Sequence, residues 1–142
     1  MTAKEYLSQV YRIDLRINTK LEQVRSLHSL ATKASATLSD SPLSGTRNVH
    51  SMEDIIVKMV DLKDEINADI GRLVELKREI VSTIEQVSAV DHRTLLELRY
   101  VCGKTWEEIA ADMYYSVRNV HILHGAALCE VGRVLRKQQG DD

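Results

Sequence analysis

Apolar residues recur every three or four positions along two long stretches of the chain. The first stretch runs from Tyr6 to about Leu38, and the second begins at Met52 and continues past Ile84. Over several heptads this spacing places the apolar side chains on one side of a helix, as in a helix-packing seam. We therefore predict an all-α chain that begins with two long helices, at about 3–38 and about 52–88. Each would extend about 50 Å.

Residues 39–51, which separate these two stretches, predict a turn. They read SDSPLSGTRNVHS and contain the chain's only proline, Pro42, with clustered Ser, Gly and Asn. Ser51, followed by Asp54, is a start signal for the second helix. The simplest arrangement is a long antiparallel helical hairpin over residues 1–88. A two-helix hairpin buries only one seam per helix, so we expect a homodimer or higher homo-oligomer.

Two shorter amphipathic helices are predicted within residues 89–142. An apolar helix at about 91–100 precedes them, either after a short break near residue 89 or continuous with the long helix. Thr105 is a capping residue, and Glu108 three positions later completes a capping box. Ser116 begins the second helix after a tight turn. Two capped helices joined this way are typical of a helix-turn-helix, in which the second helix of DNA-binding versions enters the major groove.

Helical geometry predicts which side of this second helix faces outward. With Val120 set as the inward direction, other apolar residues such as Ala127 and Val131 fall on the same side, at about 100° per residue. His124 lies close to that side, so we interpret it as a packed histidine. The residues expected to face outward or to flank that face are Arg118, Asn119, His121 and Ile122.

The chemistry of this outward face suits a DNA groove. Arg can bind guanine with two hydrogen bonds, Asn can bind adenine in the same way, and an aliphatic side chain can contact a thymine methyl. The residues expected to position the DNA backbone are Lys104, Thr105, Tyr115 and Ser116. We expect Trp106 to be a packing residue rather than a DNA contact.

Residues 95–128, which read LLELRYVCGKTWEEIAADMYYSVRNVHILHGAAL, resemble a known family. The segment is similar to the promoter-reading domain of bacterial RNA polymerase sigma factors, region four. It is more similar still to sigma-like phage regulators related to ArpU-type late-gene activators. The preceding two thirds resemble a helical segment of uncharacterised Gram-positive prophage proteins. The resemblance implies a sigma-like helix-turn-helix that binds double-stranded DNA, with RNA polymerase as a further partner.

Composition and charge narrow the possibilities. The 44% hydrophobic and 28% charged residues are ordinary for a folded, soluble chain. No apolar run is long enough for a membrane span, and two cysteines form no disulfide framework, so we expect the bacterial cytoplasm. Residues 91–142 carry seven basic and eight acidic side chains. This near-neutral balance is unusual for an independent DNA-binding domain, which normally has a basic surface.

Other candidate chemistry favours ordinary structural interpretations. We interpret the acidic run Asp61, Asp64, Glu65 and Asp69 as a solvated helix face. Cys102, His121, His124 and Cys129 lack the spacing of a zinc site. No nucleophile motif or phosphate loop is present, so we expect no enzyme activity, no metal and no cofactor. For Arg133, Arg136 and Lys137, phosphate contact and simple dipole complementation remain equally open.

The sequence therefore predicts a phage-type DNA-binding transcription regulator. Two alternatives remain open. One is a small terminase-like DNA-packaging protein, since such proteins also combine a helix-turn-helix with oligomerising helices. The other is a module that binds only protein, such as RNA polymerase, which the near-neutral charge of residues 91–142 favours.

Overall fold

The computed structural model describes residues 1–40 and 45–140, with side chains described for 1–33 and 51–140. Every described element is helical, which confirms the all-α prediction. The elements are α1 (Ala3–Asp40), α2 (Gly45–Glu85), α3 (Val90–Leu96), the π-helical turn η2 (Glu97–Val101), α4 (Trp106–Met113) and α5 (Val117–Gln138). The chain divides into two compact units, Met1–Arg12 with Leu73–Asp142, and Ile13–Arg72.

The boundaries of the two long helices differ from the prediction mainly at the start of α2. Helix α1 begins as expected, where Glu5 N donates to Thr2 Oγ1 and Thr2 N donates to Glu5 Oε2 in a reciprocal capping box. Helix α2 begins at Gly45, so the prediction of a start at Ser51 is wrong. Once a helix is nucleated, each added residue gains a backbone hydrogen bond, and residues 45–50 contain no proline to prevent this. The predicted turn at Pro42 lies outside the described residues.

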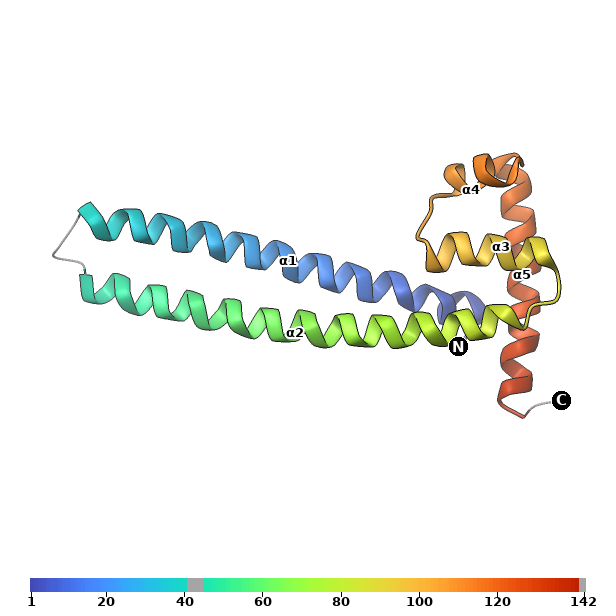
Figure 1. The fold of residues 1–142 in the computed structure, drawn as a ribbon, viewed down its shortest axis with the longest axis horizontal. Helices are drawn as coiled ribbons and strands as arrows, with labels where there is room; N and C mark the ends of the chain where they lie inside the picture. The colour runs from blue at the N-terminus through green and yellow to red at the C-terminus, as the bar shows by residue number, and fades with distance from the viewer. Residues whose placement is uncertain (41–44, 141–142) are drawn as a thin grey trace. The chain divides into compact units, whose positions relative to one another are not determined.

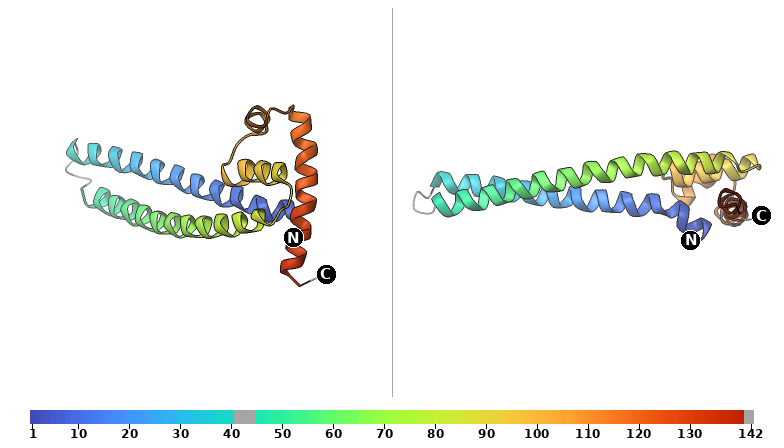
Figure 2. Two further views of the ribbon diagram at one scale, coloured as in Figure 1. Left: turned by 45° about the vertical axis from the view of Figure 1, so that its right-hand side comes forward. Right: turned by 90° about the horizontal axis from the view of Figure 1, so that it is seen from below.

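Within residues 13–72, α1 and α2 lie side by side and run antiparallel (Figures 1 and 2). Ile17 and Ile66 are buried between them. The solvated-face interpretation holds for Asp61 and Asp64, which are exposed, but it is wrong for Asp69, which is only 1% exposed. Its carboxylate accepts a 2.7 Å hydrogen bond from Lys20 Nζ and also pairs with Arg72. An ion pair with α1 therefore lies within the apolar seam.

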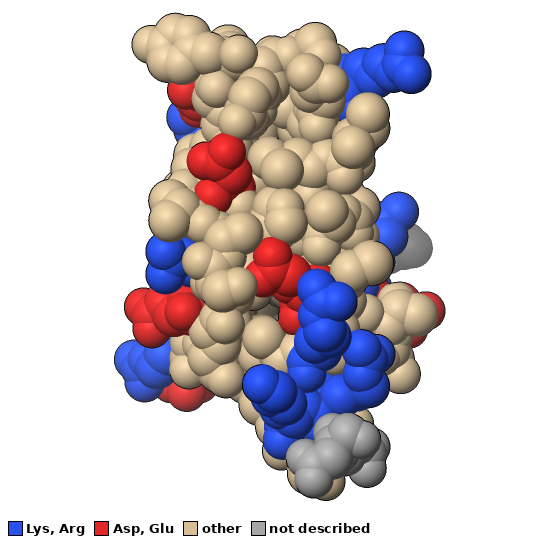
Figure 3. Space-filling model, turned by 90° about the vertical axis from the view of Figure 1, so that its right-hand side faces the viewer, with Lys and Arg blue, Asp and Glu red and all other residues tan. Residues whose placement is uncertain are grey.

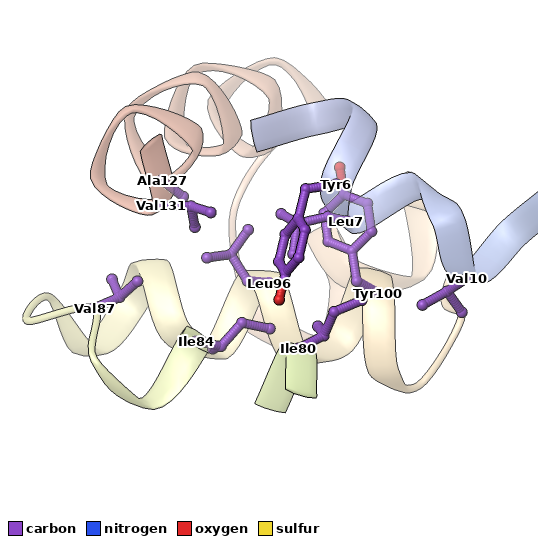
Figure 4. Close-up of a cluster of buried hydrophobic side chains, with 10 residues drawn as sticks. All are labelled: Tyr6, Leu7, Val10, Ile80, Ile84, Val87, Leu96, Tyr100, Ala127 and Val131. Carbon is purple, nitrogen blue, oxygen red and sulfur yellow. The ribbon is translucent and has the colours of Figure 1, made fainter. Parts of the chain in front are cut away.

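The other unit has one main hydrophobic core, shown in Figure 4. It joins the first turns of α1, the last turns of α2, α3 with η2, and the second half of α5. Its buried members are Tyr6, Leu7, Val10, Ile80, Ile84, Val87, Leu96, Tyr100, Ala127 and Val131. Because α2 ends at Glu85 and α3 begins at Val90, a short break separates them, which is one of the two arrangements that the sequence allows.

A second, smaller core lies within the same unit. Helices α3 and α4 both contact α5, and Leu95, Ile109 and Val120 are fully buried where they meet. Both cores contact the same side of α5, because Val120 of the smaller core lies about two turns before Ala127 of the main core. This burial fixes the rotation of α5 about its axis, and therefore which side chains it exposes. None of the described helices carries an apolar stretch of the length and hydropathy that a membrane span requires.

Candidate nucleic-acid interface

Helix α4 starts where the sequence predicts. Thr105 is extended, and its Oγ1 accepts a 3.2 Å hydrogen bond from Glu108 N. The Glu108 carboxylate accepts from the Thr105 hydroxyl rather than from the backbone of Thr105, so the capping box is only partly formed. The cap nevertheless satisfies one of the free amides of the first turn and fixes the start of the helix.

The turn at residues 114–116 reverses the chain between α4 and α5. Tyr114 has a left-handed backbone, and Tyr115 N donates to Ala110 O at 3.0 Å, as in a Schellman motif. The Tyr115 hydroxyl donates a 2.8 Å hydrogen bond to Asp91 Oδ2, which ties the turn to the start of α3. Ser116 Oγ then accepts from Asn119 N at 3.1 Å, which confirms Ser116 as the cap of α5.

The rotation of α5 agrees with the predicted orientation. Val120, Ala127 and Val131 are fully buried, and His124 is 8% exposed, which confirms it as a packed histidine. Ile122, on the opposite side, is 62% exposed. Of the eight residues predicted to contact DNA, Lys104 is half-buried and the other seven are exposed: Thr105, Tyr115, Ser116, Arg118, Asn119, His121 and Ile122.

All four residues predicted to position DNA have side-chain partners in the chain: Thr105 and Ser116 cap their helices, and Lys104 and Tyr115 are held by acids. Lys104 Nζ lies 2.5 Å from Asp112 Oδ2, and this hydrogen bond raises the pKa of the Lys104 amine. The hydrogen bond to Asp91 likewise raises the pKa of the Tyr115 phenol. Asp112 neutralises the Lys104 charge, whereas Arg118 forms no ion pair with any residue whose side chain is described.

An aromatic cluster holds α5 against α4 and η2. His124 Nε2 lies 2.7 Å from the Tyr100 hydroxyl, and the Trp106 ring meets the His124 ring edge-on at 4.7 Å between centroids. The Trp106 ring also lies 4.8 Å from His121, so this exposed residue is held on one side. Trp106 is therefore a packing residue, as expected.

The role of Arg99 is not apparent from the sequence. Its guanidinium lies over the Trp106 ring at 4.2 Å and over the Tyr11 ring at 5.2 Å, and it donates to Lys104 O at 2.9 Å. The Tyr11 hydroxyl donates to Arg99 O. The π-helical turn, in which Cys102 N donates to Glu97 O, carries both Arg99 and Tyr100. Arg99 therefore couples α1 to the segment that precedes α4.

A mainly apolar depression lies beside the exposed face of α5. It has a volume of about 270 Å³ and is lined by Tyr115, Asn119, Ile122, Leu123 and Ala126. Asn119 is the one side-chain amide in this lining, and no charged residue contributes to it. Such a surface can receive a methyl group or a small apolar side chain next to a hydrogen-bonding amide.

The described residues do not assemble a metal site. Among the side chains described, those of residues 1–33 and 51–140, no three His, Cys, Asp or Glu gather closely enough to hold an ion. Cys102 and Cys129 are both free and exposed. No three of the cysteines and histidines listed as zinc-ligand types therefore come together among the described residues, and His124 is engaged by Tyr100.

Comparison with known proteins gives one match. A family model described as "Protein of unknown function (DUF1492)" matches residues 32–131. This span runs from the second half of α1 to the second half of α5, and it includes α4, the turn and the exposed face of α5. No curated protein and no solved structure matches the chain.

Proposed function

The chain belongs to the DUF1492 family, and we propose that it is a sequence-specific DNA-binding transcription regulator of phage or prophage type. In this proposal α4, the turn and α5 form a sigma-like helix-turn-helix, and α1 with α2 forms a helical hairpin for oligomerisation or partner binding. The observation that carries the proposal is the exposure of Arg118, Asn119 and Ile122 on the first turns of a capped helix whose opposite face is buried.

The proposed roles follow from the chemistry of each group. Arg118 would bind guanine with two hydrogen bonds, Asn119 would bind adenine, and Ile122 would contact a thymine methyl. The His121 ring, which packs against Trp106, would contact the edge of the major groove. The segments around Lys104–Thr105 and Tyr115–Ser116 would lie against the DNA backbone and set the position of α5.

The sigma-like resemblance adds partners to this proposal. Regulators of this type act with RNA polymerase, and the near-neutral charge of residues 91–142 suits a protein that gains affinity from polymerase or from oligomerisation. The place of action would be the bacterial cytoplasm, where both the template and polymerase are found. No cofactor enters the mechanism.

The test is selection of binding sites from a randomised duplex pool, followed by affinity measurement on the selected site. We expect Arg118→Ala and Asn119→Ala each to reduce the preference for that site over unrelated DNA by about 1–3 kcal/mol. Arg16→Ala, at an exposed position of α1, is the control and should leave the preference unchanged. Equal binding of the selected site by the wild-type protein and Arg118→Ala would contradict the proposed contact between Arg118 and a base.

One observation favours a second candidate function, a protein-binding module. Tyr114, Val117 and Ile122 are large apolar side chains that are exposed close together in sequence, in the turn and the first turns of α5. An exposed apolar surface of this kind is common at protein interfaces. Capture of RNA polymerase by a chain that binds no duplex even at low salt would select this function over DNA binding.

A further inference from the structure

A cluster of basic side chains lies at the far end of α5 from the candidate interface. Arg133, Arg136 and Lys137 are exposed on the last turns of α5, and Lys4 is exposed on the first turn of α1. Figure 3 shows Lys and Arg side chains gathered at the lower end of the face on which α5 lies. Two segments that are distant in sequence thus contribute charge to one surface.

Three of these residues surround a shallow groove. Lys4, Arg133 and Arg136 line a hollow of about 530 Å³, whose other lining residues include Cys129 and Gly132. The residues between the cations are small or uncharged, so an extended polyanion can approach the helix backbone closely. The hollow is open to solvent on the outer side of α5, since Cys129 is exposed.

The charges of this cluster are not neutralised by neighbouring acids. Among the residues whose side chains the structure describes, none of Lys4, Arg133, Arg136 and Lys137 forms an ion pair. No acid is among the described residues that line this hollow. Glu79 lines a neighbouring hollow with Arg136. Glu130 lines another with Arg133 and Lys137. Its carboxylate is already engaged by His92 Nδ1 at 2.5 Å and by Ser88 N at 3.2 Å.

The basic cluster also lies on the same side of α5 as the proposed base contacts. Arg118 and Arg136 are 18 positions apart in sequence, which is about five helical turns and returns to the same side. Ile122 and Cys129 are exposed along the same line. The outer face of α5 therefore presents one arginine at its start, small or apolar residues in the middle, and several cations at its end.

The length of α5 decides what this face would meet. Its 22 residues extend about 33 Å, whereas the major groove is only about 12 Å wide. If the first turns of α5 enter the groove and the helix crosses it, the last turns reach one of the flanking DNA strands. Phosphates are the groups that a basic surface would meet there.

We propose that Lys4, Arg133 and Arg136 form a second DNA contact, which binds the phosphate backbone next to the groove that the start of α5 reads. This proposal rests on the proposed DNA-binding function, and it makes the first turn of α1 part of the interface. It also accounts for DNA binding by a domain that is nearly neutral overall, because the cations are gathered at one end of a single face.

The experiment measures affinity for a mixed-sequence duplex, about three helical turns long, by fluorescence anisotropy of the full chain at roughly 50 to 200 mM NaCl. The triple variant Lys4→Gln, Arg133→Gln, Arg136→Gln should bind about 100-fold more weakly at the middle of this range. The slope of log K against log salt should fall by about 2.7, since each lost phosphate contact contributes about 0.9. The preference for a selected site should stay the same, because phosphate contacts carry no sequence information.

The matched control is Arg12→Gln, Arg16→Gln, Lys58→Gln, which removes the same charge from exposed positions on α1 and α2. It should change the slope little, and thermal unfolding should show that both triple variants remain folded. Equal loss of affinity in both variants, or an unchanged slope in the first, would overturn the second contact and leave the proposed function intact. Displacement of the duplex by poly-glutamate at equal charge would also overturn it, by indicating an acidic protein as the partner. Absence of any duplex binding by wild-type protein would instead overturn the proposed function itself.

Discussion

Tyr114 combines a left-handed backbone with a side chain that is 94% exposed. A residue with a Cβ pays about 1 kcal/mol or more for this conformation, which glycine adopts freely. Because an exposed ring recovers little of that cost within the chain, the position suggests a role in recognition. We expect Tyr114→Gly to raise the free energy of unfolding by about 1 kcal/mol and to weaken binding of DNA or polymerase.

Urea unfolding measures the change in stability, and fluorescence anisotropy measures the change in binding. Tyr114→Phe is the control, since it keeps both the ring and the backbone strain, and it should match the wild type in stability. If Tyr114→Gly binds both partners as well as the wild type, the exposed ring has no part in recognition.

His124, buried beside Tyr100 and Trp106, makes the stability of the fold depend on pH. Burial lowers its pKa to about 4, and the nearby charges of Lys4, Arg99 and His121 add to this effect. In the unfolded chain histidine titrates near pH 6.5, so the unfolded state takes up a proton between about pH 6.5 and 4 that the folded state does not. The stabilising effect of the neutral His124 ring is therefore fully present above about pH 6.5. As the pH falls toward 4, the free energy of unfolding decreases by roughly 2–3 kcal/mol.

Urea unfolding at pH 7 and at pH 4.5 can isolate this contribution if the wild type is compared with His124→Gln. Glutamine does not titrate, and it can still form a hydrogen bond with the Tyr100 hydroxyl. The variant should be less stable than the wild type at pH 7, and the difference should shrink at pH 4.5. A difference that stays constant between the two pH values would mean that His124 does not titrate as described.

At the scale of helices, Asp69 determines how α1 and α2 are aligned. Its buried carboxylate is held by Lys20 of α1 and by Arg72 one turn away on α2, and the hydrogen bond from Lys20 is the main cause of its lowered pKa. Removing one partner of a buried pair leaves an uncompensated charge, whereas replacing both with apolar residues can be neutral. We therefore expect Lys20→Met to be destabilising, and Lys20→Met with Asp69→Leu to be closer to the wild type.

A double-mutant cycle in urea measures this coupling. Lys58→Met is the control, because Lys58 is an exposed lysine on α2 that forms no ion pair with a residue whose side chain is described. Additive effects of the two substitutions would show that the pair does not couple the helices. In Lys20→Met the carboxylate of Asp69 would keep only Arg72 as a partner, and its pKa would be higher than in the wild type. The loss of stability relative to the wild type should therefore shrink at low pH.

The sequence predicted those features that depend on periodicity or on a neighbour three residues away. The existence of each helix, the caps at Thr105 and Ser116, and the orientation of α5 were all predictable for this reason. The features that it did not predict depend on residues far apart in the chain. The acid at position 69 looks solvated until Lys20 is placed opposite it, and Arg99 looks like a surface residue until Tyr11 covers it.

The π-helical turn and the early start of α2 were missed for a different reason. Neither has a local signal as strong as a cap or a proline, so tertiary packing and helix propagation decide them. For the candidate interface, the sequence predicted which residues are exposed, but not that Lys104 and Tyr115 are held by Asp112 and Asp91. The basic groove that Lys4 shares with α5 is visible only in the structure, because its residues come from α1 and α5, which are far apart in sequence.

At the scale of the whole molecule, α2 exposes apolar side chains that a single chain does not cover. Ile56, Val57 and Val60 are each at least half exposed, and they lie within one turn of each other on a long helix. Exposed apolar groups grouped on one side of a helix favour packing against another helix. We expect the protein to form a homodimer in solution through this surface, and Val60→Glu to shift it toward the monomer.

Sedimentation equilibrium measures the mass, and Ala68→Glu is the control, since it adds the same charge at another exposed position of α2. A dimer with two-fold symmetry would place two copies of α5 on the DNA, so its selected site should contain two half-sites about one helical turn, or a multiple of it, apart. A monomeric wild type would contradict the predicted assembly. A ring of eight or more subunits would instead favour the packaging function, because small terminase subunits assemble as rings. Since Val60→Glu leaves the exposed face of α5 untouched, loss of the dimer should weaken binding to the paired half-sites far more than binding to a single half-site.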